Sequence, residues 1–129
     1  MIRVIIAGSR NFNDYDFLRK NVGVLINAKC TITNIPIKDI EIIHGDARGA
    51  DRLAGMLAQK NNLKCTVFQP DWQNLGRKAG FFRNKDMAKY AAEVEHNMLI
   101  AFWNGESKGT KSMIDLGLKY LKNVYVIKY

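Results

Sequence analysis

The chain has 129 residues, of which 47% are hydrophobic and 25% are charged. These values exclude a disordered or fibrous protein, and the length suits one domain with its own core, so we expect residues 1–129 to form a single domain. Lysine and arginine total 20 against 12 acidic residues, a net charge of +8, which favours anionic partners such as nucleic acid or phosphorylated small molecules.

The first half of the chain alternates between strand and helix patterns. Residues 2–7 form a β-branched run that predicts a buried strand, without the basic leader of a secretory signal. Apolar residues at helical spacing between Phe17 and Ile26 predict a helix, and residues 31–39 are predicted as a connection to a second strand over 40–44. A helix from Arg52, closed by Asn61, and a strand over 63–68 follow.

The second half continues the alternation. Residues 71–80 are predicted as a loop, 81–92 as a helix and 98–102 as a strand. A glycine-containing loop over 103–109 then leads to a helix over 113–121 and a last strand over 124–127. This order predicts an α/β fold: a Rossmann-like, doubly wound, mostly parallel sheet of about five strands with helices on both faces. No apolar run reaches the roughly 18 residues of a membrane span, so we expect a cytoplasmic protein without a membrane partner.

Metal ligands are few. Cys30 and Cys65 lie far apart without CxxC spacing, and only His44 and His96 are available to join them. We therefore predict no metal site. Cys65 is interpreted as a small core residue in a strand and Cys30 as a reduced thiol near a helix end, while both histidines are interpreted as packed residues.

Three loops that follow predicted strands each carry glycine and a cation. They are Gly8–Arg10, Gly45–Asp51 and Gly105–Thr110, and they contribute Arg10, Arg48 and Lys108. In a parallel sheet such loops meet at the carboxyl edge, where helix N-termini favour anions. The pattern predicts one anion site there, although neither the GxGxxG motif nor the GxxxxGK[ST] phosphate loop is present.

Several residues near these loops have two readings. Asp46 and Asp51 flank Arg48, and one of them either caps the following helix or contacts the ribose of a ligand. Trp72 is either a core residue or a platform for a base, and the same alternatives hold for Trp103. Phe81 and Phe82 are more simply interpreted as core.

Motifs along nearly the whole chain resemble the YspA-type branch of the SLOG superfamily. They are Gly8-Ser9-Arg10 with Phe12 and Asp14, Gly45-Asp-Ala-Arg-Gly-Ala-Asp51, Asp71-Trp72, Gly76-Arg77, Arg83-Asn84, Trp103-Asn-Gly105, Ser107 and Gly109-Thr110. The resemblance implies a Rossmann-like fold that binds nucleotides or molecules derived from them. Related families include the Lonely Guy phosphoribohydrolases, which cleave the N-glycosidic bond of nucleoside monophosphates, and DprA, which binds single-stranded DNA.

The resemblance also implies roles for individual residues. Arg83 looks like the helix arginine of the hydrolases, and Gly105, Gly109 and Thr110 are similar to their PGGxGTxxE phosphate loop. The position of the catalytic glutamate holds Met113, whose thioether accepts no proton, and Asp115 lies about 200° further round the helix. Glu106, which lies close by in the sequence, is kept as a candidate for the catalytic acid. The ligand-binding residues that we predict are Gly8, Ser9, Arg10, Gly45, Asp46, Arg48, Gly49, Asp51, Trp72, Arg77, Arg83, Asn84, Trp103, Gly105, Ser107, Gly109 and Thr110.

These residues are compatible with three functions. The first is binding or sensing of a nucleotide-derived ligand such as ADP-ribose, NAD or a cyclic nucleotide. The second is N-glycosidic hydrolysis of nucleoside monophosphates, with Arg83, Glu106, Asp46 and Asp51 as candidate catalytic residues. The third is binding of single-stranded nucleic acid through the positive charge and exposed aromatic residues. A nucleotide-derived ligand is the only cofactor expected, and assembly into a homo-oligomer is left open.

Overall fold

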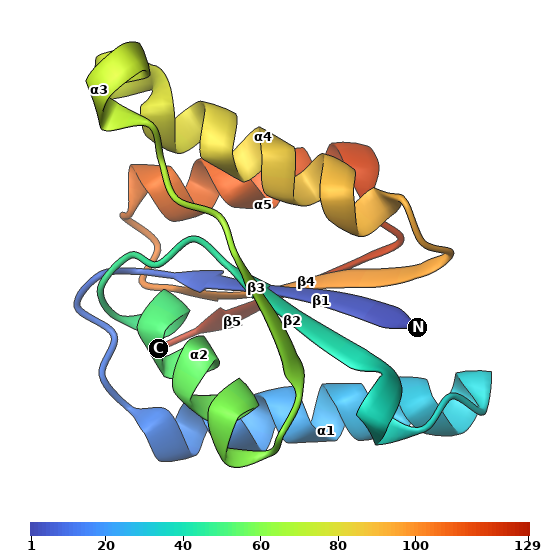
Figure 1. The fold of residues 1–129 in the computed structure, drawn as a ribbon. Helices are drawn as coiled ribbons and strands as arrows, with labels where there is room; N and C mark the ends of the chain where they lie inside the picture. The colour runs from blue at the N-terminus through green and yellow to red at the C-terminus, as the bar shows by residue number, and fades with distance from the viewer.

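Five parallel strands lie at the centre of the computed structural model, which describes all residues 1–129, with helices on both faces (Figure 1). The strands are β1 (Ile2–Gly8), β2 (Ile40–His44), β3 (Lys64–Val67), β4 (His96–Trp103) and β5 (Asn123–Lys128). The helices are α1 (Tyr15–Thr33), α2 (Ala50–Lys60), α3 (Trp72–Leu75), α4 (Ala79–Ala92) and α5 (Lys108–Tyr120), with short 3-10 turns η1 (Ile37–Asp39) and η2 (Gly76–Lys78). The doubly wound α/β fold predicted from the sequence is confirmed.

In the strand order β3-β2-β1-β4-β5, the strands β2 and β3 lie on one side of β1, and β4 and β5 lie on the other. The helices α1 and α2 cover one face of the sheet, whereas α4 and α5 cover the other (Figure 1). The connections after β1 and β4 therefore leave the sheet on opposite sides. In open α/β sheets, a switch of this kind opens a crevice at the carboxyl ends of the strands.

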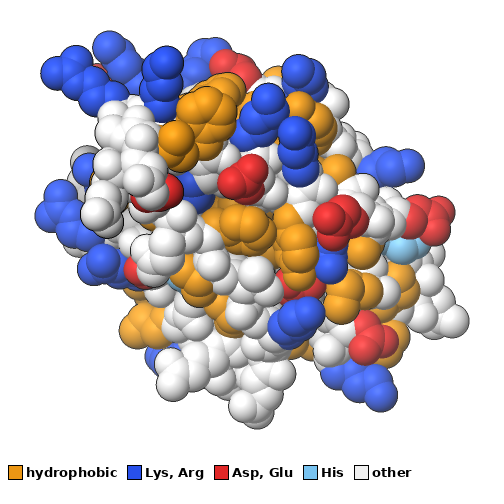
Figure 2. All heavy atoms as spheres, turned by 45° about the horizontal axis from the view of Figure 1, so that its top comes forward, with side chains coloured by type: hydrophobic (Ala, Val, Ile, Leu, Met, Phe, Trp, Pro, Cys, Tyr) orange, Lys and Arg blue, Asp and Glu red, His pale blue; other side chains and the backbone are white.

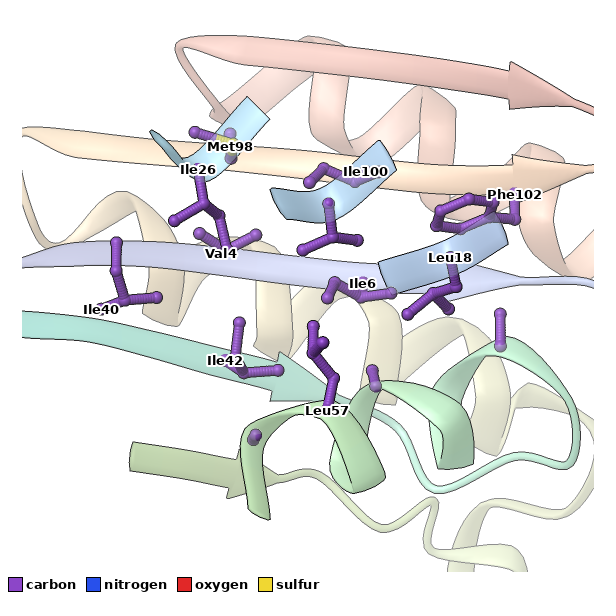
Figure 3. Close-up of a cluster of buried hydrophobic side chains, with 14 of the residues drawn as sticks. Val4, Ile6, Leu18, Ile26, Ile40, Ile42, Leu57, Met98, Ile100 and Phe102 are labelled. Atoms are coloured by element: carbon purple, nitrogen blue, oxygen red, sulfur yellow. The ribbon is translucent and has the colours of Figure 1, made fainter. Parts of the chain in front are cut away.

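Alternate residues of the central strands divide the core between the two faces. Val4 and Ile6 pack with Leu18 of α1 and Leu57 of α2 (Figure 3). Residues of opposite parity, such as Ile5, pack under α4 and α5 instead. Because β1 is buried on both sides after Arg3, residues 4–7 form a continuous apolar run rather than an alternating one.

The largest differences from the sequence prediction are the starts of α3 and α5, whereas α2 and α4 each begin two residues earlier than predicted. The predicted loop over 71–80 is wrong, because Asp71 accepts a hydrogen bond from the Asn74 N–H and caps α3, after which η2 leads directly into α4. The last helix begins at Lys108 rather than at residue 113, because Ser107 caps it by accepting from the Thr110 N–H. The connection before β2 starts later than the predicted residue 31, because α1 continues to Thr33. The helix ends at Asn34, which adopts a left-handed conformation.

The interpretation of Cys65 as a core residue is wrong. Cys65 is exposed, because β3 is a short edge strand whose side chains are largely uncovered. Cys30 is a free, half-buried thiol near the end of α1, as predicted. No group of three or more His, Cys, Asp or Glu residues is placed to hold a metal ion. None of the helices has both the length and the apolar character needed to cross a membrane.

One completely buried acidic residue lies in the sheet, away from the carboxyl edge. Glu41 of β2 is completely buried and accepts hydrogen bonds from Arg3 at 3.1 Å, Thr66 at 2.5 Å and Tyr90 at 2.6 Å. Burial alone would raise the pKa of Glu41, but these donors lower it overall. The network ties β1, β2, β3 and α4 together at this position.

Candidate functional site

A cavity of about 350 Å³ lies at the carboxyl edge of the sheet. Its walls come from the end of β1, the loop after β2, the α3–α4 segment and the first turns of α5. Many of the residues predicted to bind a ligand line this cavity, namely Gly8, Arg10, Asp51, Trp72, Arg77, Arg83, Asn84, Ser107, Gly109 and Thr110. The loops after β1, β2 and β4 therefore converge in space, as their place in a parallel sheet predicts.

The other predicted residues lie outside this cavity. Gly45, Asp46 and Arg48 line a neighbouring cleft instead. Ser9, Gly49, Trp103 and Gly105 line neither hollow. Glu106 is exposed and also lies outside both. Glu106 is thus separated from the cavity in which Asp51 lies.

Ser9 joins the three loops to one another. Its N–H donates to the carbonyl of Phe102 in β4 at 3.1 Å, and its Oγ accepts from the Asn104 N–H at 3.4 Å. Gly49, at φ +82°, approaches so closely that an added Cβ would lie 2.3 Å from the Ser9 carbonyl oxygen. Only glycine fits this contact. Ser9 and Gly49 therefore hold the loops together and do not line the cavity or the cleft.

Trp103 and Gly105 shape the turn into α5. The indole Nε1 of Trp103 donates to the Ser107 carbonyl at 3.1 Å, which leaves the ring half-buried against the loop. The side chain of Asn104 accepts from the N–H groups of Glu106 and Ser107, both at 2.9 Å. Gly105 has φ +85°, a conformation that favours glycine. These contacts fix where the N-terminus of α5 points.

Asp51 is the buried carboxyl group of the site. The residue is 4% exposed, and its Oδ2 accepts from the Gly45 N–H at 2.9 Å and the Ala47 N–H at 3.4 Å. Neither Asp46 nor Asp51 caps α2 with its side chain, because the residue at the cap is Gly49. Burial raises the pKa of Asp51 to about 6, although the nearby Arg83 and the backbone donors oppose the shift.

Arg83 links α4 to the loop after β2. Its Nη1 donates to the Gly45 carbonyl at 2.5 Å, and its Nε donates to Asn84 Oδ1 at 2.9 Å. Asn84 in turn donates to the Gly109 carbonyl at 3.5 Å. Burial, together with the charge of Arg10, lowers the pKa of Arg83, whereas Asp51 raises it. A guanidinium with so high an ordinary pKa remains charged, so Arg83 brings a fixed positive charge to the cavity.

Further cations around the cavity lack acidic partners. Arg10, Arg77 and Lys108 line it, and none forms an ion pair within 4.0 Å. The first turn of α5 also borders it through Lys108, Gly109 and Thr110. The first amides of a helix have no acceptor within the helix, and its dipole is positive at that end. Positive potential from side chains and backbone therefore meets in one hollow.

Aromatic rings stand at the mouth of the cavity. Trp72 is 53% exposed and Phe81 is 48% exposed, and both line it. Phe82 is 39% exposed and does not line it. The interpretation of Phe81 and Phe82 as core is wrong, and so is the core alternative for Trp72, because α3 and the start of α4 extend beyond the edge of the sheet (Figure 1). Figure 2 shows hydrophobic side chains beside lysine and arginine side chains at this end of the molecule.

Besides Lys108, several residues of the cavity were not among the predicted ligand-binding residues, namely Ala7, Ala47, Gly80, Phe81, Met87, Ser112 and Met113. A helix that begins at Lys108 places Gly109, Ser112 and Met113 on one face, so recognising Ser107 as a cap would have found them. Met113 lies where the resemblance places a catalytic glutamate, and it is 1% exposed. The cavity wall is therefore apolar at that position.

Comparisons with known proteins agree with this architecture. Residues 2–75 match the sequence model of the YspA, cpYpsA-related SLOG family. The chain is 34% identical over 116 residues to the Gene 61 protein of Mycobacterium phage D29, covering 86% of this chain and 84% of the phage protein. Its fold is similar to that of DNA processing protein A (DprA) from Streptococcus pneumoniae, with a TM-score of 0.68 and 17% identity over 98% of this chain and 50% of that chain. The chain thus spans half the length of that solved structure, and it belongs to the YspA, cpYpsA-related SLOG family.

Proposed function

We propose that the protein binds a nucleotide or a nucleotide-derived molecule in the cavity at the carboxyl edge of the sheet. The observation that carries this proposal is the meeting of unpaired cations, a helix N-terminus and exposed aromatic rings in one hollow. The cations and the helix N-terminus would be enough to bind a simple anion. In addition, the exposed rings of Trp72 and Phe81 are suited to stacking on a nucleotide base. Membership in the SLOG family supports the same class of ligand.

The chemistry of the lining suggests how such a ligand lies. A phosphoryl group fits against the first turn of α5, where Arg10 and Arg77 supply charge. The Oδ1 atom of Asp51 forms no hydrogen bond within the protein, so it can accept one from a ribose hydroxyl. The base then stacks on Trp72 at the mouth of the cavity.

Thermal unfolding tests the proposal directly. A ligand that binds only the folded state raises the unfolding temperature by an amount set by its concentration and Kd. We expect at least one of AMP, ADP-ribose, NAD and cyclic nucleotides to stabilise the protein, and Arg10→Gln to weaken the shift. Arg19→Gln, on the exposed side of α1, is the control that removes the same charge elsewhere. Absence of any shift at millimolar ligand contradicts the proposal.

A second candidate function rests on Asp51. A carboxyl group with a pKa of about 6, buried beside Arg83 in a cavity, is suited to general acid–base catalysis near neutral pH. In N-glycosidic hydrolysis, water adds to the sugar carbon as the bond to the base breaks, and the base leaves with a proton. We expect release of free adenine from AMP if this function holds, and its loss in Asp51→Asn. Intact AMP after prolonged incubation with the parent protein excludes the reaction for this substrate.

Single-stranded nucleic acid remains a further predicted partner. Its affinity would fall steeply with salt, because binding releases the counterions that surround the phosphate backbone. A small nucleotide held in the cavity contacts fewer phosphates and would depend less on salt. Titrating a short oligonucleotide and AMP at two salt concentrations therefore separates the two kinds of ligand.

A further inference from the structure

A second hollow, a cleft of about 290 Å³, adjoins the cavity. The two share Arg10, Ala47, Trp72 and Arg83 in their walls. They are therefore neighbouring compartments on either side of these shared residues rather than separate sites. The cleft lies over the loop after β2, away from the N-terminus of α5.

The cleft contains an excess of positive charge. Arg10, Arg48, Arg52 and Arg83 line it, against the single carboxylate of Asp46. That carboxylate is already engaged, since its Oδ1 lies 3.6 Å from Arg52 Nε and its Oδ2 accepts from Gln69 at 2.9 Å. Arg10 and Arg48 have no acidic partner. Like charges held close together repel one another, and an anion between them removes that cost.

The backbone around the cleft is held in place without a ligand. Asp46 has φ +57°, and its N–H donates to His44 Nδ1 at 3.0 Å. The Gly45 carbonyl accepts from Arg83, so this guanidinium is anchored at the boundary between the two hollows. A preformed site loses less conformational entropy when a ligand binds. The backbone of the cleft and Arg83 are therefore preformed, whereas the exposed side chains of Arg10 and Arg48 are free to turn towards an anion.

We propose that the cleft is a second anion subsite, so that the ligand is a nucleotide with phosphoryl groups on opposite sides of its ribose. This inference rests on the proposed function. One phosphoryl group lies in the cavity at the first turn of α5, and the second lies in the cleft between Arg10 and Arg48. The base stacks on Trp72, which borders both hollows. A nucleotide whose phosphates form one continuous chain would place its charge in a single compartment.

Isothermal titration with matched probes tests this arrangement. The probes are 5′-AMP, ADP and adenosine 3′,5′-bisphosphate, together with the corresponding guanosine nucleotides. We expect the bisphosphate to bind at least about 10-fold tighter than the monophosphate, which is the effect of one additional charge-assisted contact. Arg48→Gln should remove most of this difference, because it should weaken binding of the bisphosphate by a clearly larger factor than binding of the monophosphate. Arg48 is exposed, so the variant should fold.

The control variant and the alternative outcomes separate the two proposals. Arg19→Gln lowers the net charge equally on α1 and should leave the preference for the bisphosphate unchanged. If the monophosphate binds but the bisphosphate is no tighter, or if Arg48→Gln weakens all probes equally, the second subsite is overturned and the proposed function stands. ADP provides a further test. If its affinity exceeds that of AMP by as much as the affinity of the bisphosphate does, and if Arg48→Gln weakens both equally, the two-sided arrangement is overturned. If none of these probes binds but ADP-ribose, NAD or a cyclic nucleotide raises the unfolding temperature, the second subsite is overturned and the proposed function stands. If no ligand of either set binds, both proposals fail.

Discussion

The carboxylate of Asp51 accepts a hydrogen bond from the backbone N–H of Gly45, six residues earlier in the chain, at 2.9 Å. This contact bends the loop after β2 back onto the start of α2. The Gly45 carbonyl, on the other side of the same residue, accepts from Arg83 of α4. Asp51 and Arg83 thus reach the site from helices on opposite faces of the sheet and meet at one glycine.

Replacing Asp51 should change how stability depends on pH. Because its pKa is raised from 3.8 to about 6, the folded protein binds more protons than the unfolded chain between these values. Asp51 therefore lowers the free energy of unfolding as the pH rises through this window, by about 3 kcal/mol for a shift of about two pH units. We expect urea unfolding to show a smaller loss, or a larger gain, of stability with rising pH in Asp51→Asn than in the parent protein. Asp86→Asn, at an exposed position of α4, is the control, and parallel curves for all three proteins would exclude this role.

Replacing Gly49 should lower the stability of the folded protein. An added Cβ would lie 2.3 Å from the Ser9 carbonyl oxygen and 2.8 Å from the Arg10 carbonyl oxygen, at a backbone conformation that alanine rarely adopts. We expect Gly49→Ala to cost about 1–3 kcal/mol or more. Gly23→Ala is the control, because nothing lies within 4 Å of a Cβ there and alanine favours the helix by up to about 1 kcal/mol. Denaturant unfolding measures both changes, and equal stabilities would contradict the close contact of the loops.

Removing the indole of Trp72 should weaken nucleotide binding with little effect on folding. Trp72 is 53% exposed, so it contributes little to the core. Stacking of a base on an aromatic ring contributes about 1–3 kcal/mol, so we expect the affinity of Trp72→Ala to fall by about 5-fold or more. Phe82→Ala removes an exposed ring that does not line the cavity, and its affinity should stay the same. Titration and thermal unfolding of both variants provide the comparison, and equal losses of affinity would argue against stacking on Trp72.

The buried network at Glu41 should be sensitive to a neutral replacement. Glu41→Gln leaves Arg3 without its buried carboxylate and gives Thr66 and Tyr90 a competing donor, so we expect a loss of about 3–5 kcal/mol. Because the pKa of Glu41 is lowered in the folded state, its contribution is present above the ordinary pKa and is lost as the pH falls. The difference in stability between the parent and the variant should therefore shrink in acid.

Glu93 provides the control for this network. It contacts the same Arg3 at 3.0 Å, but its side chain is 64% exposed. Solvent screens such a pair, and Glu93→Gln should change the free energy of unfolding by about 1 kcal/mol or less. Chemical denaturation of the two variants across a range of pH measures the contrast. Similar effects of the two replacements would show that burial does not decide the strength of this network.

Several features of the site were predictable from local sequence patterns. Glycine with a cation after each of three strands predicted that the three loops would meet, because parallel strands place their carboxyl ends at one edge. Arg10 and Lys108 do line one cavity, whereas Arg48 lines the neighbouring cleft. Helix boundaries were less predictable. The capping side chains of Asp71 and Ser107 start helices in segments that contain glycine, and the polar composition of those segments favoured loops.

The sequence by itself determined the alternation of strands and helices, since apolar periodicity reflects which residues must leave water. It did not determine that Cys65 is exposed on an edge strand, that Trp72 stands at the mouth of a cavity or that Asp51 is buried. Those properties depend on which elements pack against one another, and residues distant in the chain decide them. The division of the site into a cavity and an arginine-lined cleft likewise exists only once α4 has crossed the sheet and brought Arg83 to Gly45.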